Sequence, residues 1–228
     1  SGEVRLDYRA NDDLSAIFAA GYNSADNLEL TGLGAGLTQG WSLGYYQARF
    51  LYKDWFAQIY QNWSDAGDTF LLRNGDPIVD NSKMTAMQVQ HSASMGVRQD
   101  FTYGVDLLYT RPDTEGTVNG NNEDTDDIDE FGAYLQSETA LTNMLDLVLA
   151  LRYDDHNRIA DGEISPRAAL VFKPSETQTV RLTYNRAFAT PSSLNLSLDL
   201  RSSPDAFGIG AAFAPTLGFI PAIDVRAQ

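Results

Sequence analysis

The densest group of potential ligand atoms in the sequence lies in an acidic segment, residues 119–130, which reads NGNNEDTDDIDE. Carboxylate and amide oxygens are the ligands that Ca²⁺ prefers, so this segment could hold a calcium ion. However, it lacks the central glycine and the terminal bidentate glutamate of an EF-hand loop. We therefore favour a solvated, mobile loop whose charge opposes aggregation, and we expect no metal site.

Residues suited to catalysis are few and stand apart. The sequence has no cysteine, and its two histidines, His91 and His156, stand alone. No Gly-x-Ser-x-Gly, phosphate-loop or His-Glu-x-x-His pattern occurs, so no known arrangement for nucleophilic, phosphate or zinc chemistry is present. We therefore expect no enzymatic activity and no cofactor.

The charge balance excludes one class of partner. The 228 residues include 31 acidic and 16 basic side chains, which gives a net charge of −15. Since no basic stripe is available to neutralise phosphates, nucleic acid is not an expected partner. The hydrophobic fraction of 43% and the mean hydropathy of −0.29 would suit a soluble protein. A transmembrane β-barrel has similar values, because half of each strand is polar.

Two alternating runs joined by a short turn occupy residues 164–191. In the first run, Leu170 and Phe172 point to one side while Arg167 and Lys173 point to the other. Residues 174–177 turn the chain, because proline lacks the ladder N–H and serine favours local backbone bonds. The return run alternates in the same way. This two-residue period predicts a β-hairpin with one apolar and one polar face.

The same pattern recurs along the chain and predicts an all-β protein. Short connections fall at residues 11–13, 53–54, 99–100, 140–143 and 174–177, and longer ones at 23–40, 64–83, 111–127 and 155–163. The intervening strands are close to the ~9–11 residues that a tilted membrane strand needs. We predict an antiparallel up-and-down meander of about ten strands, part of a transmembrane β-barrel, because short turns at one end and long loops at the other are typical of outer-membrane barrels.

Aromatic residues gather near both predicted ends of the strands. The two sets are Tyr52, Trp55, Phe101, Tyr103 and Phe172 beside the short turns, and Tyr22, Tyr46, Trp63, Tyr109 and Tyr153 near the longer connections. Such sets indicate two membrane interfaces, although aromatic residues are common in any strand. His91 has the parity of the lipid face, and counting from the turns places it near the outer interface, where a charge is tolerated.

The segment SPRAALVFKPSETQTVRLTYNRAFATPS, residues 165–192, resembles the barrel domain of TonB-dependent outer-membrane receptors. It follows LRYDDH, and it combines an arginine-bearing strand, a Lys-Pro turn and a Tyr-Asn-Arg-Ala-Phe segment in the expected order. The resemblance extends back through RPDTEG at 111–116 and YLQSET at 134–139. It implies a receptor in the Gram-negative outer membrane, surrounded by lipid, that takes up a large scarce nutrient such as a siderophore, cobalamin or a glycan.

Receptors of this family have a barrel of ~22 strands filled by an N-terminal plug, which contacts TonB. The chain differs from this pattern: no plug is evident, about half of the strands are present, and the sequence ends in Val-Arg-Ala-Gln. We expect residues 1–228 to be a partial barrel domain, with TonB acting through a plug that is absent here. The meander would occupy residues 1–191, and residues 192–228 would form a long outer loop, because three prolines interrupt the strand period.

Two other protein classes remain open from the sequence. A small stand-alone outer-membrane barrel or pore fits the strand count, since closure would remove both sheet edges. A soluble β-rich binding module is the second alternative. It is disfavoured because Leu145, Leu147, Leu149 and Leu151 would present a continuous apolar face that needs cover.

Candidate ligand residues in the acidic segment follow from its place in an outer loop. They are Asn121, Asn122, Asp124, Asp126 and Asp127. Their polar side chains would face the medium from which the nutrient arrives.

A second set of candidates lies on the predicted lumen wall, where the plug or the ligand would be contacted: Glu130, Arg152, Arg167, Arg181 and Asn185. Counting outward from each hairpin turn sets Glu130 opposite Arg152, Arg152 near Arg167, and Arg167 near Asn185. Two arginines against one carboxylate leave positive charge, which would bind an acidic group of the plug or an anionic ligand. A solvated wall, with ion pairs worth at most ~1 kcal/mol each, is the open alternative.

Overall fold

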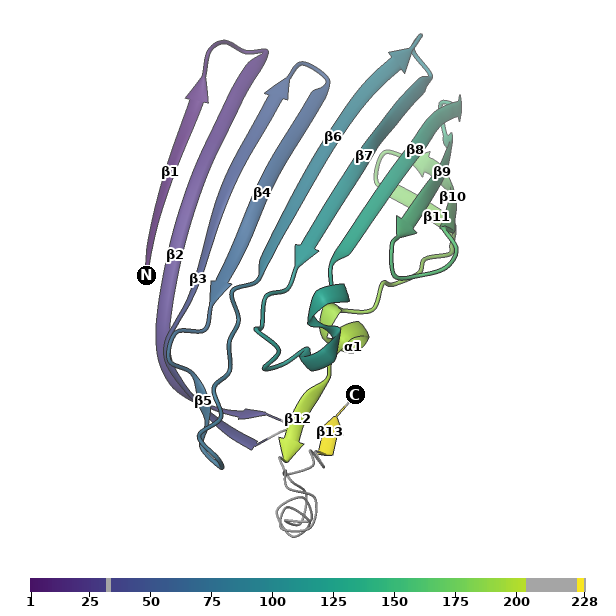
Figure 1. Ribbon diagram of the computed structural model, residues 1–228. Helices are drawn as coiled ribbons and strands as arrows, with labels where there is room; N and C mark the ends of the chain where they lie inside the picture. The colour runs from purple at the N-terminus through teal and green to yellow at the C-terminus, as the bar shows by residue number, and fades with distance from the viewer. Residues whose placement is uncertain (32–33, 204–224, 228) are drawn as a thin grey trace, which may run out of the picture.

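The computed structural model describes residues 1–31, 34–203 and 225–227. Its main element is one antiparallel sheet in which neighbouring strands follow chain order, apart from a short strand, β5, that pairs with β3 (Figure 1). The strands are β1 (Gly2–Arg9), β2 (Leu14–Thr31), β3 (Gly34–Tyr52), β4 (Trp55–Asp65), β5 (Phe70–Leu71), β6 (Lys83–Met95), β7 (Gln99–Arg111), β8 (Ile128–Thr142), β9 (Leu145–His156), β10 (Glu163–Ser175) and β11 (Gln178–Asn185). The predicted all-β meander is confirmed.

Alternation along the strands gives the sheet two chemically different faces. One face, called here the polar face, carries Gln58, Gln88 and Asp106, which pair across β4, β6 and β7. The opposite, apolar face carries Val89 and Val105, which pair with each other and are each 42% exposed. Since an uncovered apolar face of this extent is unfavourable in water, the face requires an apolar environment.

The short connections all lie at one end of the sheet, and the long ones lie at the other (Figure 1). This confirms the predicted alternation of connection length. The predicted turn at 99–100 is wrong, because Gln99 and Asp100 already pair with both β6 and β8. The chain instead turns over residues 96–98, where Gly96 adopts a positive φ of 68° that a glycine accepts without a steric penalty.

The predicted long connection over residues 23–40 is also wrong. Strands β2 and β3 continue past the rest of the sheet as a paired extension up to Thr31 and Gly34, with one irregularity between Ala25 and Asn27. The glycine and asparagine content of this stretch favours a loop, yet the two backbones satisfy each other's hydrogen bonds. Strand β5 pairs with the extension of β3, so the connection between β4 and β6 supports it from the other side.

Aromatic contacts occur near both ends of the apolar face. Tyr22 and Trp63 lie with ring centroids 5.8 Å apart toward the long connections. Toward the short turns, His91 lies between Trp55, at 4.3 Å between ring centroids, and Tyr103, whose hydroxyl is 2.9 Å from Nδ1 of His91. The prediction that His91 lies near the outer interface is therefore wrong, because its cross-strand partner Trp55 directly follows the 53–54 turn.

The C-terminal part of the described chain leaves the meander after β11. It forms the short helix α1 (Ser193–Ser197) and then β12 (Leu200–Ser203), which pairs with β13 (Val225–Ala227) rather than with β11. These elements lie at the end of the sheet that holds the long connections, beside the 3-10 helix η1 (Gly120–Thr125) (Figure 1). The remaining part of the predicted outer loop, residues 204–224 and 228, lies outside the described residues. No helix in the described parts of the chain is long and apolar enough to cross a membrane.

Candidate functional site on the polar face

One row of positions crosses the polar face at a single height. Gln58 pairs with Gln88, Gln88 with Asp106, Asp106 with Gly132, and Gly132 with Asp154, from β4 through β9. Because Gly132 has no side chain, the row contains a gap between two carboxylates.

The guanidinium of Arg152 fills this gap. Nη1 lies 2.5 Å from Oδ2 of Asp106, and Nη2 lies 2.7 Å from Oδ1 of Asp154. The side chains of Arg152, Asp106 and Asp154 are 38%, 28% and 17% exposed, so water screens the three charges only in part. A planar guanidinium held by two carboxylates has a fixed orientation.

Two glycines make this arrangement possible. A Cβ atom at Gly132 would lie 2.1 Å from Nη2 of Arg152, and one at Gly104 would lie 2.6 Å from the hydroxyl of Tyr134. Tyr134 pairs with Arg152 across the strands and donates a 2.8 Å hydrogen bond to Gln90. Glycine at these positions therefore lets long side chains lie flat over neighbouring strands.

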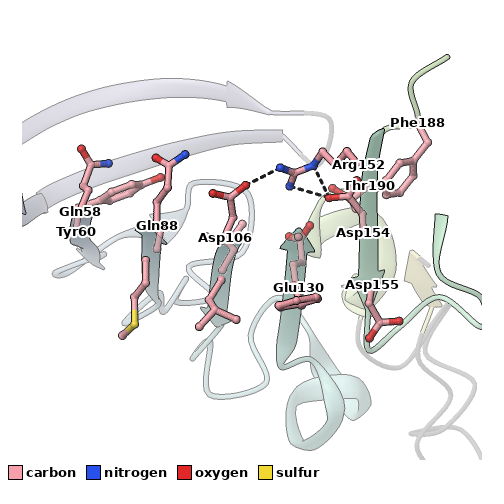
Figure 2. A pocket seen from close by; sticks show the side chains of 16 residues that line it. Gln58, Tyr60, Gln88, Asp106, Glu130, Arg152, Asp154, Asp155, Phe188 and Thr190 are labelled. Carbon is pink, nitrogen blue, oxygen red and sulfur yellow. Dashed lines mark hydrogen bonds and ion pairs between the residues drawn. The ribbon is translucent and has the colours of Figure 1, made fainter. Parts of the chain in front are cut away.

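A hollow of about 310 Å³ surrounds this group. Figure 2 shows Gln58, Gln88 and Asp106 projecting from the same side of the sheet, while Asp155 points to the opposite side. Two residues of the segment that follows β11, Phe188 and Thr190, line the same hollow. The chain beyond the last meander strand thus returns over the polar face. The volume is at the lower end of the range for ligand pockets.

Residues 3–218 match a family model described as TonB dependent receptor-like, beta-barrel. The chain belongs to this family. No match was found among curated proteins. Members of the family are outer-membrane receptors with a transport role, and the family is not an enzyme class. In a receptor barrel the polar face of the sheet lines the lumen, and the apolar face meets lipid.

The predicted row on the lumen wall of this receptor barrel is wrong in its first two contacts. Glu130 pairs with His156, and Arg152 pairs with Tyr134, four residues from the predicted partner along β8. The prediction placed the turn at 140–143, but β8 continues to Thr142 and the turn lies two residues further along. Since a shift of four residues keeps the parity, Glu130 and Arg152 still share the lumen face.

The third contact of the row is confirmed: Arg167 pairs with Asn185. On its other side Arg167 pairs with Ala150, whereas Arg152 pairs with Ser165. The two arginines therefore share a face but are displaced from direct pairing by two residues along the strands. Arg181 pairs with Val171 on the same face of the barrel wall. The candidates therefore fall into two places: Glu130 and Arg152 in the hollow described above, and the residues of β10 and β11 nearer to the short turns.

The acidic connection of the barrel is folded rather than irregular. The backbone N–H of Asn121 donates to Oδ2 of Asp199 at 2.8 Å, and Nδ2 of Asn122 donates to the carbonyl of Ser197 at 3.1 Å. The N–H of Asp199 donates in turn to the carbonyl of Val118. These contacts join η1 to the C-terminal segment, so both asparagines take part in holding that segment in place.

The three aspartates of the candidate set have different surroundings. Asp126 is 2% exposed and accepts a 2.6 Å hydrogen bond from Nδ2 of Asn119. Its burial raises the pKa of this carboxyl above the usual 3.8. Asp127 lies 3.4 Å from Nε of Arg111, and Asp124 is exposed. Within the described ranges, no group of three or more His, Cys, Asp or Glu side chains is arranged to hold a metal ion.

Several residues of the hollow were missed by sequence reasoning. Asp106 and Asp154 have the parity of the lumen face, and Asp106 stands between the apolar, lipid-facing Val105 and Leu107, so an acidic residue on this parity was the available signal. Gly132 could have been suspected because an isolated glycine inside a strand often marks a close approach of another group. Phe188 has no such signal, since it belongs to an irregular segment.

Proposed function

We propose that this chain is the barrel segment of a receptor for TonB-dependent uptake of a large scarce nutrient across the Gram-negative outer membrane. The observation that carries the proposal is the hollow on the lumen face, with its fixed Asp106–Arg152–Asp154 group, in a sheet whose other face is apolar and exposed. TonB acts through a plug domain that occupies the lumen of the whole receptor.

In this proposal the nutrient contacts the hollow around Arg152 and the connection between β7 and β8, which contains η1. Asp106 contributes an unusual feature, because its Oδ1 atom is buried and has no hydrogen-bond partner among the described residues. A buried acceptor of this kind is satisfied by water or by a donor of the ligand. Phe188 adds an apolar ring, and Glu130 adds a further carboxylate at the same hollow. A siderophore, cobalamin or a glycan carries the donors that such a wall can accept.

In this proposal, the candidate residues of the acidic connection shape the rim of the nutrient site. Asn121 and Asn122 hold the segment after β11 against η1, and that segment borders the hollow through Phe188 and Thr190. The proposal makes this joined unit the outer rim of the nutrient site, with Asp124, which is exposed, facing the medium.

Neither alternative class is supported by a specific observation. A soluble binding module would leave residues such as Leu182 and Tyr184, 73% and 63% exposed, uncovered in water. A closed ten-stranded barrel would pair β1 with β11, whereas each of these strands has a single neighbour in the described sheet.

A growth experiment tests the proposed function. A strain that lacks the receptor, the same strain with the receptor restored, and a restored strain without TonB are supplied with a ferric siderophore, cobalamin or an oligosaccharide as the only source of that nutrient. We expect one nutrient class to support growth only when both the receptor and TonB are present. Receptor-dependent growth that persists without TonB would contradict the proposal, as would growth that never depends on the receptor.

A further inference from the structure

A second hollow, of about 410 Å³, lies on the polar face near the short turns. Its lining includes Arg98 from the 96–98 turn, Arg167 and Lys173 from β10, and Arg181 from β11. This concentration of basic residues is notable in a chain with a net charge of −15. We call it the basic hollow.

The basic hollow is also lined by Asp100, Glu138 and Asp146, so its four basic side chains exceed its acidic ones by a single charge. Among the described residues, however, none of these carboxylates forms an ion pair with an arginine of the hollow. Asp146 forms a 2.5 Å ion pair with Lys173. Asp100 accepts a hydrogen bond from Ser94, and Glu138 accepts one from Gln136. In the described part of the chain, the side chains of Arg98, Arg167 and Arg181 form no ion pair or hydrogen bond, and all three are exposed. Each guanidinium therefore presents its donors to the lumen.

Arg152 does not contribute to this surplus of positive charge. Its guanidinium is held between Asp106 and Asp154, so its charge is balanced within the first hollow, of about 310 Å³. The sequence analysis combined Arg152 with Arg167 as the binding site for an acidic group. The structure favours a site without Arg152, made of Arg98, Arg167 and Arg181.

The spacing of the arginines indicates the shape of a partner. Arg167 pairs with Asn185, and Arg181 lies four residues before Asn185 on β11 and points to the same face. At about 3.3 Å per residue, the two arginines are roughly 13 Å apart along the strand. An extended peptide spans the same distance with carboxylates four residues apart, whereas one small anion would serve both only if the side chains converged. Guanidinium groups bind carboxylates in a bidentate manner.

We propose that the basic hollow docks an extended, acidic peptide segment inside the barrel lumen, with its carboxylates on Arg98, Arg167 and Arg181. The inference rests on the proposed function in one respect, because a polypeptide must occupy the lumen of the whole receptor. Beyond the proposed function, the inference specifies where on the barrel wall this polypeptide binds and that the bound segment is acidic.

Cross-linking in the intact receptor tests this inference. A photoreactive benzoylphenylalanine replaces Thr183, which lies between Arg181 and Asn185 on the same face of β11. The captured peptide is identified by mass spectrometry. We expect a segment that contains two or more Asp or Glu residues. In the Arg167→Glu, Arg181→Glu variant the yield of this product falls about tenfold, because like charges then face each other.

Arg9→Glu is the matched control. Arg9 is exposed at the short-turn end of β1, on the same face as Arg5 and Asp7 but far from β11 in the order of strands. Its reversal leaves the yield unchanged. Replacing the acidic residues of the captured segment by lysine restores the cross-link in the Arg167→Glu, Arg181→Glu variant, which a merely structural effect of the reversals would not do.

Three results would overturn the inference: a captured peptide without acidic residues, capture of lipid alone, or a cross-link that survives the double reversal. Inorganic phosphate that protects Arg167 and Arg181 from a guanidine-modifying reagent, with no peptide captured, would mean a small-anion site and would equally overturn it. Uptake of the nutrient is measured in parallel. If uptake requires TonB and no acidic peptide is captured, the inference fails while the proposed function stands.

Discussion

The side chain of Arg152 lies over the backbone of Gly132 in the barrel wall, in the space that a side chain at residue 132 would fill. A Cβ atom at Gly132 would lie 2.1 Å from Nη2 of Arg152. The ion pairs to Asp106 and Asp154 therefore depend on the absence of a side chain at Gly132.

Replacing Gly132 by valine should displace the guanidinium and separate it from Asp106. We expect the free energy of unfolding of the intact barrel in lipid vesicles, measured by urea titration, to fall by about 1 kcal/mol, since these partly exposed pairs are screened by water. Gly2→Ala is the control, because no atom lies within 4 Å of the added Cβ. Equal effects of the two substitutions would show that the gap at Gly132 is not required.

Asp126 should make the stability of the acidic connection depend on pH. Its pKa is raised by burial, so the folded form binds the proton more strongly than the unfolded form. The stability of the connection is therefore greatest at low pH and falls as the pH rises from 3.8 through the raised pKa.

Hydrogen exchange of the η1 amides, corrected for the intrinsic exchange rate, measures this dependence. Asp126→Asn keeps an acceptor for Asn119 and should abolish it. Asp124→Asn, at an exposed position of the same helix, should leave it in place. Protection that increases with pH in the wild type would contradict the assignment.

Asp199 should hold the C-terminal segment against η1. Asp199→Ala removes the acceptor of the partly buried N–H of Asn121, a loss of about 1 kcal/mol. We expect faster proteolysis within residues 186–199 of the folded receptor. Asn195→Ala, at an exposed position in α1, serves as the control, and equal cleavage of the two variants would refute the role of Asp199.

The register shows which parts of this fold can be read from the sequence. Arg167 was correctly paired with Asn185 because Pro174 marks the turn between them. Glu130 was wrongly paired with Arg152 because residues 140–144 contain no glycine or proline, and a turn without such a residue is hard to locate. The extension of β2 and β3 was missed because its composition is that of a loop while long-range pairing decides its structure.

The candidate site was harder to predict than the fold. The contact between Asp106 and Arg152 joins β7 to β9, so its prediction requires two correct registers and the gap at Gly132. Asp126 is buried because of the way its connection folds, and the two-residue period of the strands gives no information about the folding of a connection. In contrast, the two faces of the sheet follow directly from the two-residue period.

A charge on the lipid face should be costly. Val89→Arg places a guanidinium on the apolar face and should lower the free energy of unfolding by ~2–4 kcal/mol. Gln88→Arg, one residue earlier, faces the lumen opposite Asp106 and should change it by less than about 1 kcal/mol. A larger loss for Gln88→Arg than for Val89→Arg would reverse the assignment of the faces.

The central claim, that the apolar face meets lipid while the polar face lines a lumen, is tested most directly by spin labels at these two positions. Val89→Cys and Gln88→Cys variants of the intact receptor are labelled in a bilayer, and their collision rates with oxygen and with a water-soluble nickel chelate are measured. The account predicts that the label at 89 collides with oxygen and is protected from nickel, and that the label at 88 shows a much lower ratio of oxygen to nickel collisions. Equal ratios at the two positions, or a higher ratio at 88, would contradict it.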